Sequence, residues 1–307
     1  MPARQQKYIY PTIIAIALAV APLFAPRYFI SLLAIVFSWI ILAVSWHFFC
    51  GSTKYISLGS AAFFGTGFYI TALFGKSLPI FTVILLGGVI SFLLSFCIGL
   101  VTLRLKGMYF AIFTYGLSEL LKNTLIWLET VVWGTPGRFV VNLDIEFIYY
   151  IMLVLVFVVN AFFYLLRRTR FGYALKAIGE SEDTAEHVGI NTTIYKTIGF
   201  SLSSLFMGVV GSILVTRWTY VDPRMGFSGL YSFMPAIMTI FGGIESKYGP
   251  ILGAVILSLL SEILLTGFKE YYMVILGAVL LFFVVLLPKG LYSILEKISQ
   301  KFSQRGG

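Results

Sequence analysis

Glu119 and Lys122 lie within a long apolar stretch and are the charges in this chain that most suggest chemistry. They are three residues apart on a predicted helix with the glutamate first, which is favourable spacing for an ion pair. Ionisable groups at membrane depth usually face a protein interior or an aqueous path. Two interpretations follow. The pair borders a translocation pathway, or it is a structural pair near the outer interface with Lys122 beside Trp127.

Other reactive residue types are sparse or badly placed for catalysis. His47 and His187 are far apart on unlike segments, so the sequence predicts no zinc site and no histidine base. The tripeptide at 75–77 resembles the end of a nucleotide-binding loop, but it lacks the required earlier glycine and follows an apolar run. We therefore expect no catalytic residues, no metal and no cofactor. Glu262 is a further carboxyl group within an apolar run.

The composition predicts an all-α polytopic membrane protein. Apolar residues make up 59% of the 307 residues and charged residues 11%, with a mean hydropathy of +0.94. A soluble core of this length could not hide so much apolar surface. A membrane-spanning helix needs roughly 20 apolar residues, so the chain has room for about ten spans and no separate soluble domain. The net charge of +9 does not indicate nucleic-acid binding, because the basic residues flank apolar segments.

The apolar runs of spanning length divide the chain into ten predicted segments. The first follows basic residues and has two interpretations, a cleaved signal peptide or an uncleaved first span, of which we prefer the second. The run at 231–243 is short and either crosses the membrane or re-enters it. In chain order the ten runs are 9–25, 29–49, 57–74, 78–103, 108–128, 147–166, 194–216, 231–243, 251–266 and 271–287.

The segment 167–196 is the one long hydrophilic stretch, with five basic and four acidic residues. Four apolar residues recur there at helical spacing, and Ser181 begins a second run with Glu182 and Asp183, as a helix start should. Gly189 then stands where a helix C-terminus favours glycine. The pattern predicts two short amphipathic helices with a bend at Gly179, lying at a membrane surface. The alternative is a merely solvated connector. The four apolar residues are Phe171, Ala174, Leu175 and Ile178.

Charge distribution gives the predicted orientation. Ten crossings with the amino terminus inside leave most basic residues, including those of 167–196, on the cytoplasmic side. A faint internal repeat accompanies this topology: the run GGVISFLLS after Pro79 resembles GAVILSLLS after Pro250, and the two copies run in opposite directions. Inverted repeats of this kind build many transporters. Similar composition is the alternative explanation.

Small residues cluster in the two spans of this repeat. We include them, with Glu119 and Lys122, among the candidate pathway residues. Their glycines either let another backbone approach closely or shape broken helices that expose backbone to a solute. The small residues concerned are Ser57, Gly59, Gly65, Gly67, Gly242 and Gly243.

Nearly the whole chain after the first span resembles the membrane permeases of branched-chain amino acid ABC importers, of the LivM type. The segment 167–196 carries the most specific part of this resemblance, and the outer loop departs from the usual paired glycine after threonine. The motifs are YISLGSAAFFGTGFY (55–69), TYGLSELLKN (114–123) with WGTPG (133–137), RRTRFGYALKAIGESEDTAEHVGINTTIYK (167–196), FGGIESKYGPILGA (241–254) and LPKGL (287–291).

The resemblance implies a single permease domain over 1–307 whose segment 167–196, the coupling loop, docks on an ATPase subunit from the cytoplasm. Ala185, Glu186 and Gly189 match the family's coupling signature, with alanine before glutamate here, and Gly172 is included with them. It also implies a second permease subunit, two ATP-binding subunits, an extracytoplasmic solute-binding protein and a place in the bacterial inner membrane, in contact with lipid.

Two hypotheses about energy coupling remain. The leading one is a passive importer permease for a small solute, with leucine-like amino acids as the family default and urea or short amides as other solutes of similar permeases. The rival is a self-sufficient secondary transporter that uses Glu119 or Glu262 as a proton-linked carboxylate.

Overall fold

The computed structural model describes residues 17–286 and 290–292, so most of the predicted first span lies outside the described residues, although 17–24 are helical. Helices dominate, as predicted, and one antiparallel pair of two-residue strands joins them. In chain order the elements are α2 (Arg27–Thr53), α3 (Ser60–Phe74), α4 (Ile80–Thr102), α5 (Met108–Trp133), β1 (Arg138–Phe139), α6 (Ile145–Leu166), α7 (Arg170–Glu180), α8 (Glu182–His187), α9 (Thr192–Leu214), the 3-10 turn η1 (Val215–Arg217), β2 (Tyr220–Val221), α10 (Pro223–Gly226), α11 (Gly229–Gly242), α12 (Gly249–Gly267) and α13 (Tyr272–Leu286).

Six helical stretches among the described residues are long and apolar enough to cross a membrane, which makes this a multi-pass protein. They are Arg27–Thr53, Ile80–Thr102, Ile145–Leu166, Thr192–Arg217, Pro223–Gly242 and Gly249–Gly267. Three further predicted spans form helices with a different character. α3 and α13 have 15 residues each, and α5 has 26 residues but includes Glu119, Lys122 and Glu129. Short length and internal charge therefore separate these three helices from the six.

Helix α2 forms the centre of the helix bundle. It is apolar on every side, which is typical of a helix surrounded by protein, and its buried residues include Trp46, Phe48 and Phe49. α6, α9, α11 and α12 all pack against it. The helix starts after Pro26 and ends at Lys54, whose φ of 59° turns the chain away from the helix axis. α2 is therefore in contact with four other helices of the bundle.

Helices α3, α4 and α9 pack tightly because small residues line their contacts. A Cβ atom on Gly67 would lie 1.9 Å from the carbonyl oxygen of Gly208, and one on Gly87 would lie 1.9 Å from Ser212 Oγ. Ser212 Oγ also donates a hydrogen bond to Gly67 O at 2.9 Å. Such close approach of backbones is what small residues permit between helices in membranes.

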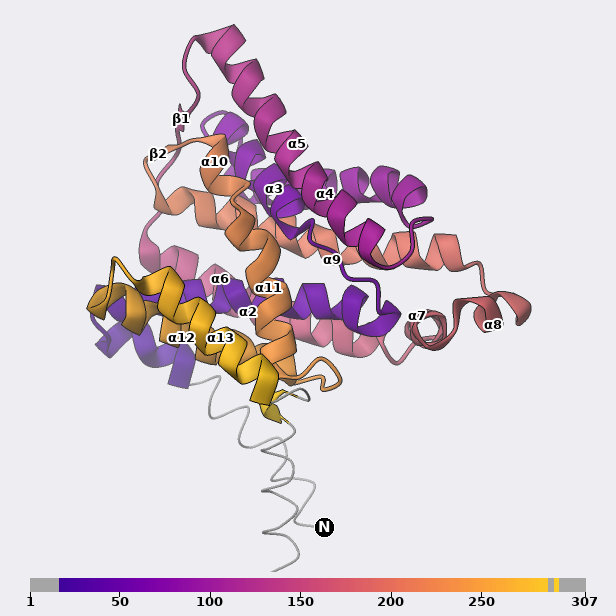
Figure 1. Ribbon diagram of the computed structural model, residues 1–307. Coiled ribbons are helices and arrows are strands. Elements are labelled where there is room, and N and C mark those ends of the chain that lie inside the picture. The colour runs from indigo at the N-terminus through magenta and orange to yellow at the C-terminus, as the bar shows by residue number, and fades with distance from the viewer. Residues whose placement is uncertain (1–16, 287–289, 293–307) are drawn as a thin grey trace, which may run out of the picture.

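The two ends of the bundle differ in what they carry (Figure 1). At one end the α5–α6 link pairs with the segment after α9 through β1 and β2, and Tyr220 OH donates to Pro136 O at 2.9 Å. At the other end α7 and α8 lie beside the end of α2 and the start of α9 (Figure 1). Segments predicted outside thus gather at one end, and segments predicted inside gather at the other.

The predicted short run at 231–243 begins earlier than its sequence suggested. Asp222 caps α10 by accepting a hydrogen bond from Met225 N at 3.1 Å, and Ser228 caps α11 by accepting one from Leu230 N at 3.4 Å. The two helices follow each other so closely that 20 residues, Pro223–Gly242, form one stretch of spanning length. The capping residues explain the earlier start.

Candidate functional site

The coupling loop forms the two short helices that its sequence predicted. Thr169 caps α7 by accepting a hydrogen bond from Gly172 N at 3.5 Å, and Ser181 caps α8 by accepting one from Thr184 N at 3.3 Å. The helix boundary lies at Ser181, whose backbone is extended, and not at Gly179. The amphipathic pattern of α7 is confirmed, because Ala174, Leu175 and Ile178 are buried together with Gly172, while Phe171 is partly buried against the core.

Glycines let α7 lie directly on neighbouring backbone. A Cβ atom on Gly179 would lie 2.1 Å from the carbonyl oxygen of Ser52, in the last turn of α2. A Cβ atom on Gly172 would lie 2.5 Å from Arg167 Cα, inside the turn that leads from α6 into α7. Gly172, a predicted coupling residue, therefore allows the α6–α7 turn to pack closely, and Gly179 allows α7 to lie against the end of α2.

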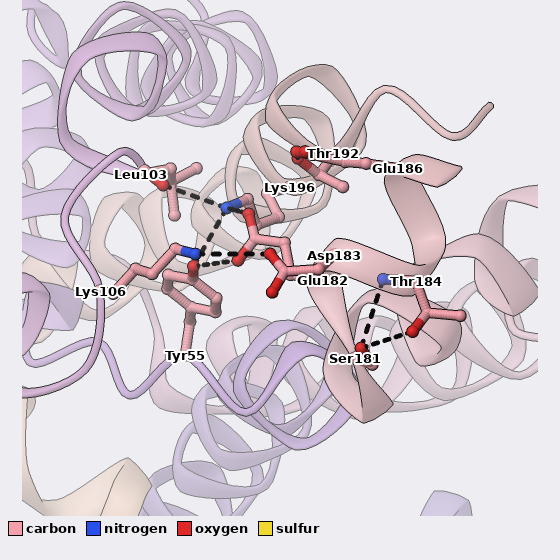
Figure 2. A network of polar contacts seen from close by, with 10 residues as sticks. All are labelled: Tyr55, Leu103, Lys106, Ser181, Glu182, Asp183, Thr184, Glu186, Thr192 and Lys196. Carbon is pink, nitrogen blue, oxygen red and sulfur yellow. Dashed lines mark hydrogen bonds and ion pairs between the residues drawn. The ribbon is translucent and has the colours of Figure 1, made fainter. Parts of the chain in front are cut away.

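Lys196, the last residue of the coupling loop, joins this loop to two other segments of the chain (Figure 2). Its ammonium group forms a short ion pair with Glu182 of α8 and donates hydrogen bonds to Tyr55 OH and to Leu103 O, both at 3.1 Å. Tyr55 OH in turn donates to Glu182 Oε2 at 2.5 Å. Lys196 is only 2% exposed although it is charged. A buried ammonium is tolerable here because all three of its protons have acceptors. We call these four residues the Lys196 cluster.

Two groups of the Lys196 cluster, Tyr55 and Glu182, have pKa values that their surroundings shift. Burial raises the pKa of Tyr55, and its hydrogen bond to Glu182 raises it further, so the phenol remains a donor. Burial alone would raise the pKa of Glu182, but the hydrogen bonds from Lys196 and Tyr55 outweigh it and lower the pKa below its usual value. Glu182 is therefore a carboxylate that accepts from both neighbours.

A second polar contact ties the start of the coupling loop to α2. Arg167 Nη2 lies 2.8 Å from His47 Nδ1, and His47 Nε2 lies 2.6 Å from Ile244 O. Because arginine can only donate, Nδ1 must accept and Nε2 must carry the proton that goes to Ile244 O. Burial lowers the pKa of Arg167 to about 10, so the guanidinium is still charged at neutral pH. One arginine thus links the α6–α7 turn, α2 and the α11–α12 link.

The predicted coupling residues of α8 hold that helix against α9. Ala185 is 2% exposed, and Glu186 Oε1 accepts a hydrogen bond from Thr192 Oγ1 at 2.6 Å. Gly189 has a φ of +87°, in the left-handed region that favours glycine, and ends α8. Ile190 N closes this turn by donating to Ala185 O at 3.0 Å. These residues fix the geometry of the turn between α8 and α9.

The outer face of the coupling loop presents both apolar and charged side chains. Tyr173 and Val188 are 64% and 71% exposed. Lys176, Glu180 and Asp183 are also largely exposed. The buried residues of the loop therefore face the bundle, and a mixed surface of apolar and charged groups faces away from it.

The candidate pathway residue Ser57 lies in the link between α2 and α3. Ser57 O accepts a hydrogen bond from Trp46 Nε1 at 2.7 Å, and Ser57 Oγ accepts one from Gly59 N at 3.2 Å. Leu58 N donates to Thr114 Oγ1 of α5 at 3.0 Å. A cavity of about 10 Å³, room for about one water molecule, lies beside this link, and its lining includes Ser57. The α2–α3 link, which also contains Tyr55, thus contacts both α2 and α5.

The candidate pathway glycines occupy helix contacts. A Cβ atom on Gly65 would lie 2.5 Å from the ring of Phe227, and Gly67 meets α9 as described above. A Cβ atom on Gly242 would lie 1.8 Å from Gly249 O, where α11 packs against α12, and Gly243 ends α11 with a φ of +115°. Gly65 and Gly67 therefore lie in the continuous helix α3, and Gly242 and Gly243 lie at the end of α11.

Glu119 and Lys122 form the ion pair that their spacing predicted. Glu119 Oε2 lies 2.5 Å from Lys122 Nζ, and the side chains are 33% and 21% exposed respectively. The pair lies near the middle of α5 and far from the coupling loop. The structure thus divides the predicted site residues into a group at the coupling loop and a group along the helices.

Sequence reasoning missed the Lys196 cluster and the contact between Arg167 and His47. The charge distribution places Lys196 on the cytoplasmic side, and the sequence predicts no metal or catalytic role for His47. The available signal was a single lysine in the first turns of a long apolar helix, a placement that requires a partner. Among the described residues, no group of three or more His, Cys, Asp or Glu side chains is placed to hold a metal ion.

Two proteins named high-affinity branched-chain amino acid transport system permease protein LivM are similar to this chain. The one from Salmonella typhimurium is 29% identical over 94% of this chain and 75% of its own length, and the one from Escherichia coli is 28% identical over 90% and 73%. The ribose import permease protein RbsC of Escherichia coli is 32% identical over 41% of each chain. No solved structure was found that matches.

The family described as "Branched-chain amino acid transport system / permease component" matches residues 28–284, which is most of the chain. The resemblance stated from the sequence motifs is therefore confirmed, and with it the prediction of an importer permease. The chain belongs to the family of permease components of branched-chain amino acid transport systems.

Proposed function

We propose that this permease moves branched-chain amino acids through the bacterial inner membrane by transmitting force from partner ATP-binding subunits through the coupling loop. The observation that carries this proposal is the Lys196 cluster. It connects α8, the surface element, to the start of α9, the end of α4 and the α2–α3 link. A displacement of α8 cannot leave these three segments in place without breaking a buried ion pair.

Two contacts connect the coupling loop to the interior of the bundle and would transmit a displacement of α8 to it. Through Tyr55, the Lys196 cluster reaches the link that bears Ser57 and leads into α3. Through Arg167 and His47, the start of the coupling loop reaches Ile244 in the link after α11. α3 and α11 are the two helices that hold the candidate pathway glycines. We infer that closure of the ATP-binding subunits shifts both helices together and switches the pathway from outward to inward access.

The proposed topology has ten crossings with the coupling loop in the cytoplasm. The helices α3, α5 and α13 and the run at 9–25 supply the four crossings beyond the six clear spans. The proposed inverted repeat relates α3 and α4 to α11 and α12, and each of these pairs packs together. In this topology the two copies run in opposite directions around the pathway.

The proposed assembly contains further subunits. The LivM relatives are named as permease proteins of a transport system, which implies partner chains. We propose a second permease subunit, two ATP-binding subunits and an extracytoplasmic solute-binding protein, with lipid around the assembly. The exposed surface around Tyr173 and Val188 is the proposed contact with an ATP-binding subunit.

Reconstitution tests the proposal against the secondary-transporter alternative. The chain is purified from native membrane with the proteins that accompany it, placed in liposomes, and assayed for uptake of labelled leucine with ATP inside. We expect uptake that requires ATP and the accompanying ATP-binding subunits. Leucine uptake by the isolated chain, driven by a proton gradient and abolished by Glu119→Gln or Glu262→Gln, would contradict the proposal.

A further inference from the structure

We propose that the Glu119–Lys122 pair on α5 is the station that holds the charged head group of the amino acid as it passes through the membrane. This inference rests on the proposed function and adds the residues that recognise the solute inside the permease. The ligand class is a zwitterion, with one ammonium and one carboxylate group on the same carbon atom.

The first step of the argument is the position of α5. Its principal contacts within the chain are with α3 and α10, and it runs obliquely to α2, α6 and α9 (Figure 1). Only one narrow stripe of the helix is buried, at Phe110, Thr114, Ser118 and Glu129. The remaining face of α5 is left open by this chain.

The second step is the chemistry of that open face. Glu119 and Lys122 lie beside the buried stripe, and Gly116 and Asn123 lie on the exposed side, so the polar residues form a patch near the middle of the helix. A Cβ atom on Gly116 would have no neighbour within 4 Å, so the space in front of it is open. In the proposed topology α5 crosses the membrane, and a charged group that faces lipid at the centre of a membrane costs about 2.5–3.5 kcal/mol or more. We therefore expect the patch to border water or protein, as a pathway wall does.

The third step is an apolar surface one turn away. Tyr115 precedes Glu119 by four residues, which is about one helical turn or a rise of about 6 Å along the helix axis. Its ring centroid lies 5.3 Å from that of Phe233 on α11, and Phe233 is 41% exposed. A leucine-like solute whose head group lies at Glu119 and Lys122 can place its side chain against these two rings. The site thus offers charged groups to the head group and aromatic rings to the apolar side chain.

The charges of the pair explain why a zwitterion fits better than a neutral amide. Inserting a zwitterion opens one ion pair and forms two, because the ammonium group faces Glu119 and the carboxylate group faces Lys122. A neutral solute can form hydrogen bonds with the two groups but offers neither of them an opposite charge. The arrangement therefore favours amino acids over urea and short amides.

The test uses the complete transporter in liposomes and compares leucine with leucinamide, which keeps the ammonium group but lacks the carboxylate. Because one binding protein serves every variant, its own preference cancels when uptake ratios are compared between variants. In Lys122→Met, we expect leucine uptake to fall about ten-fold or more, as loss of a charged hydrogen bond predicts. The ratio of leucine to leucinamide uptake should fall by a similar factor.

Two further variants distinguish recognition from structure. Glu119→Gln with Lys122→Met removes both charges without leaving one unpaired, and we expect strongly reduced leucine uptake from a transporter that still assembles and hydrolyses ATP. The matched control is Lys269→Met with Glu270→Gln, an exposed pair of opposite charges in the α12–α13 link, which should transport normally. Normal leucine uptake by the Glu119/Lys122 double variant, or an unchanged uptake ratio in Lys122→Met, would overturn the inference. Neither result would affect the proposed ATP-driven function, which fails only if the unmodified transporter shows no ATP-dependent uptake.

Discussion

Replacing Lys196 by methionine is the perturbation that most directly probes the Lys196 cluster. The substitution keeps most of the side-chain volume but removes the ammonium group, which leaves Leu103 O without that donor and Glu182 with Tyr55 alone of its two hydrogen-bond donors in the cluster. Removing one partner of a buried ion pair costs about 3–5 kcal/mol. Glu182 retains 17% exposure of its side chain and so recovers some hydration. We therefore expect the free energy of unfolding to fall by about 2–4 kcal/mol.

A double-mutant cycle isolates the pair from general packing. Adding Glu182→Gln to Lys196→Met removes the unpaired charge, so the double variant should be more stable than Lys196→Met, with a coupling energy of about 1–3 kcal/mol. The control is Lys176→Met, because Lys176 and Glu180 form an exposed pair at 3.9 Å that should contribute about 0.5 kcal/mol or less.

The assay has two parts, equilibrium unfolding in mixed detergent micelles and the ratio of leucine transported to ATP hydrolysed by the reconstituted transporter. We expect Lys196→Met to lower both the stability and the transport ratio. If Lys196→Met unfolds within 0.5 kcal/mol of the unmodified chain and transports with an unchanged ratio, the reasoning about the cluster is wrong.

Three other predictions concern the contacts between the coupling loop and the rest of the bundle. Gly179→Val places a side chain about where Ser52 O lies, so it should lift α7 from α2 and lower the free energy of unfolding by about 1–3 kcal/mol or more. It should also uncouple ATP hydrolysis from uptake. The control is Gly267→Ala, where a Cβ meets nothing within 4 Å, and it should be close to neutral in the same unfolding and uptake assays. Arg167→Met leaves His47 without its donor and should lower the transport ratio, while a transport ratio unchanged from the unmodified protein would show that this contact carries no force. The pH dependence of Glu182 has a definite sign: because its folded-state pKa is lowered, its stabilisation is complete above the ordinary pKa of about 4.3 and is lost as pH falls through the lower folded value. The stability difference between the unmodified chain and Glu182→Gln should thus be constant from about pH 8 to pH 5, and a difference that shrinks within that range would contradict the assignment.

The two helices of the coupling loop were predictable, because the residues that define them are close together in the sequence. The apolar spacing in α7 and the capping serine of α8 act within one or two helical turns, and the helices form where they predict. The ion pair of Glu119 and Lys122 was predictable for the same reason.

The Lys196 cluster could not be predicted, because its members come from separate parts of the chain. Lys196 lies 141 residues from Tyr55 and 93 residues from Leu103 in the sequence, and only the packing of α2, α4 and α9 brings them together. The start of α3 shows the same effect. The sequence predicts a span from Ser57, but the helix begins at Ser60, because the link before it is held by hydrogen bonds to Trp46 and Thr114.

Photo-crosslinking from the outer face of the coupling loop tests the central claim most directly. Val188 is replaced by p-benzoylphenylalanine in the complete transporter, because Val188 is exposed and lies at the end of α8, next to Gly189. We predict a crosslink to an ATP-binding subunit that changes in yield when ATP is added. A crosslink to the extracytoplasmic binding protein instead would contradict the claim that force enters this permease through the coupling loop.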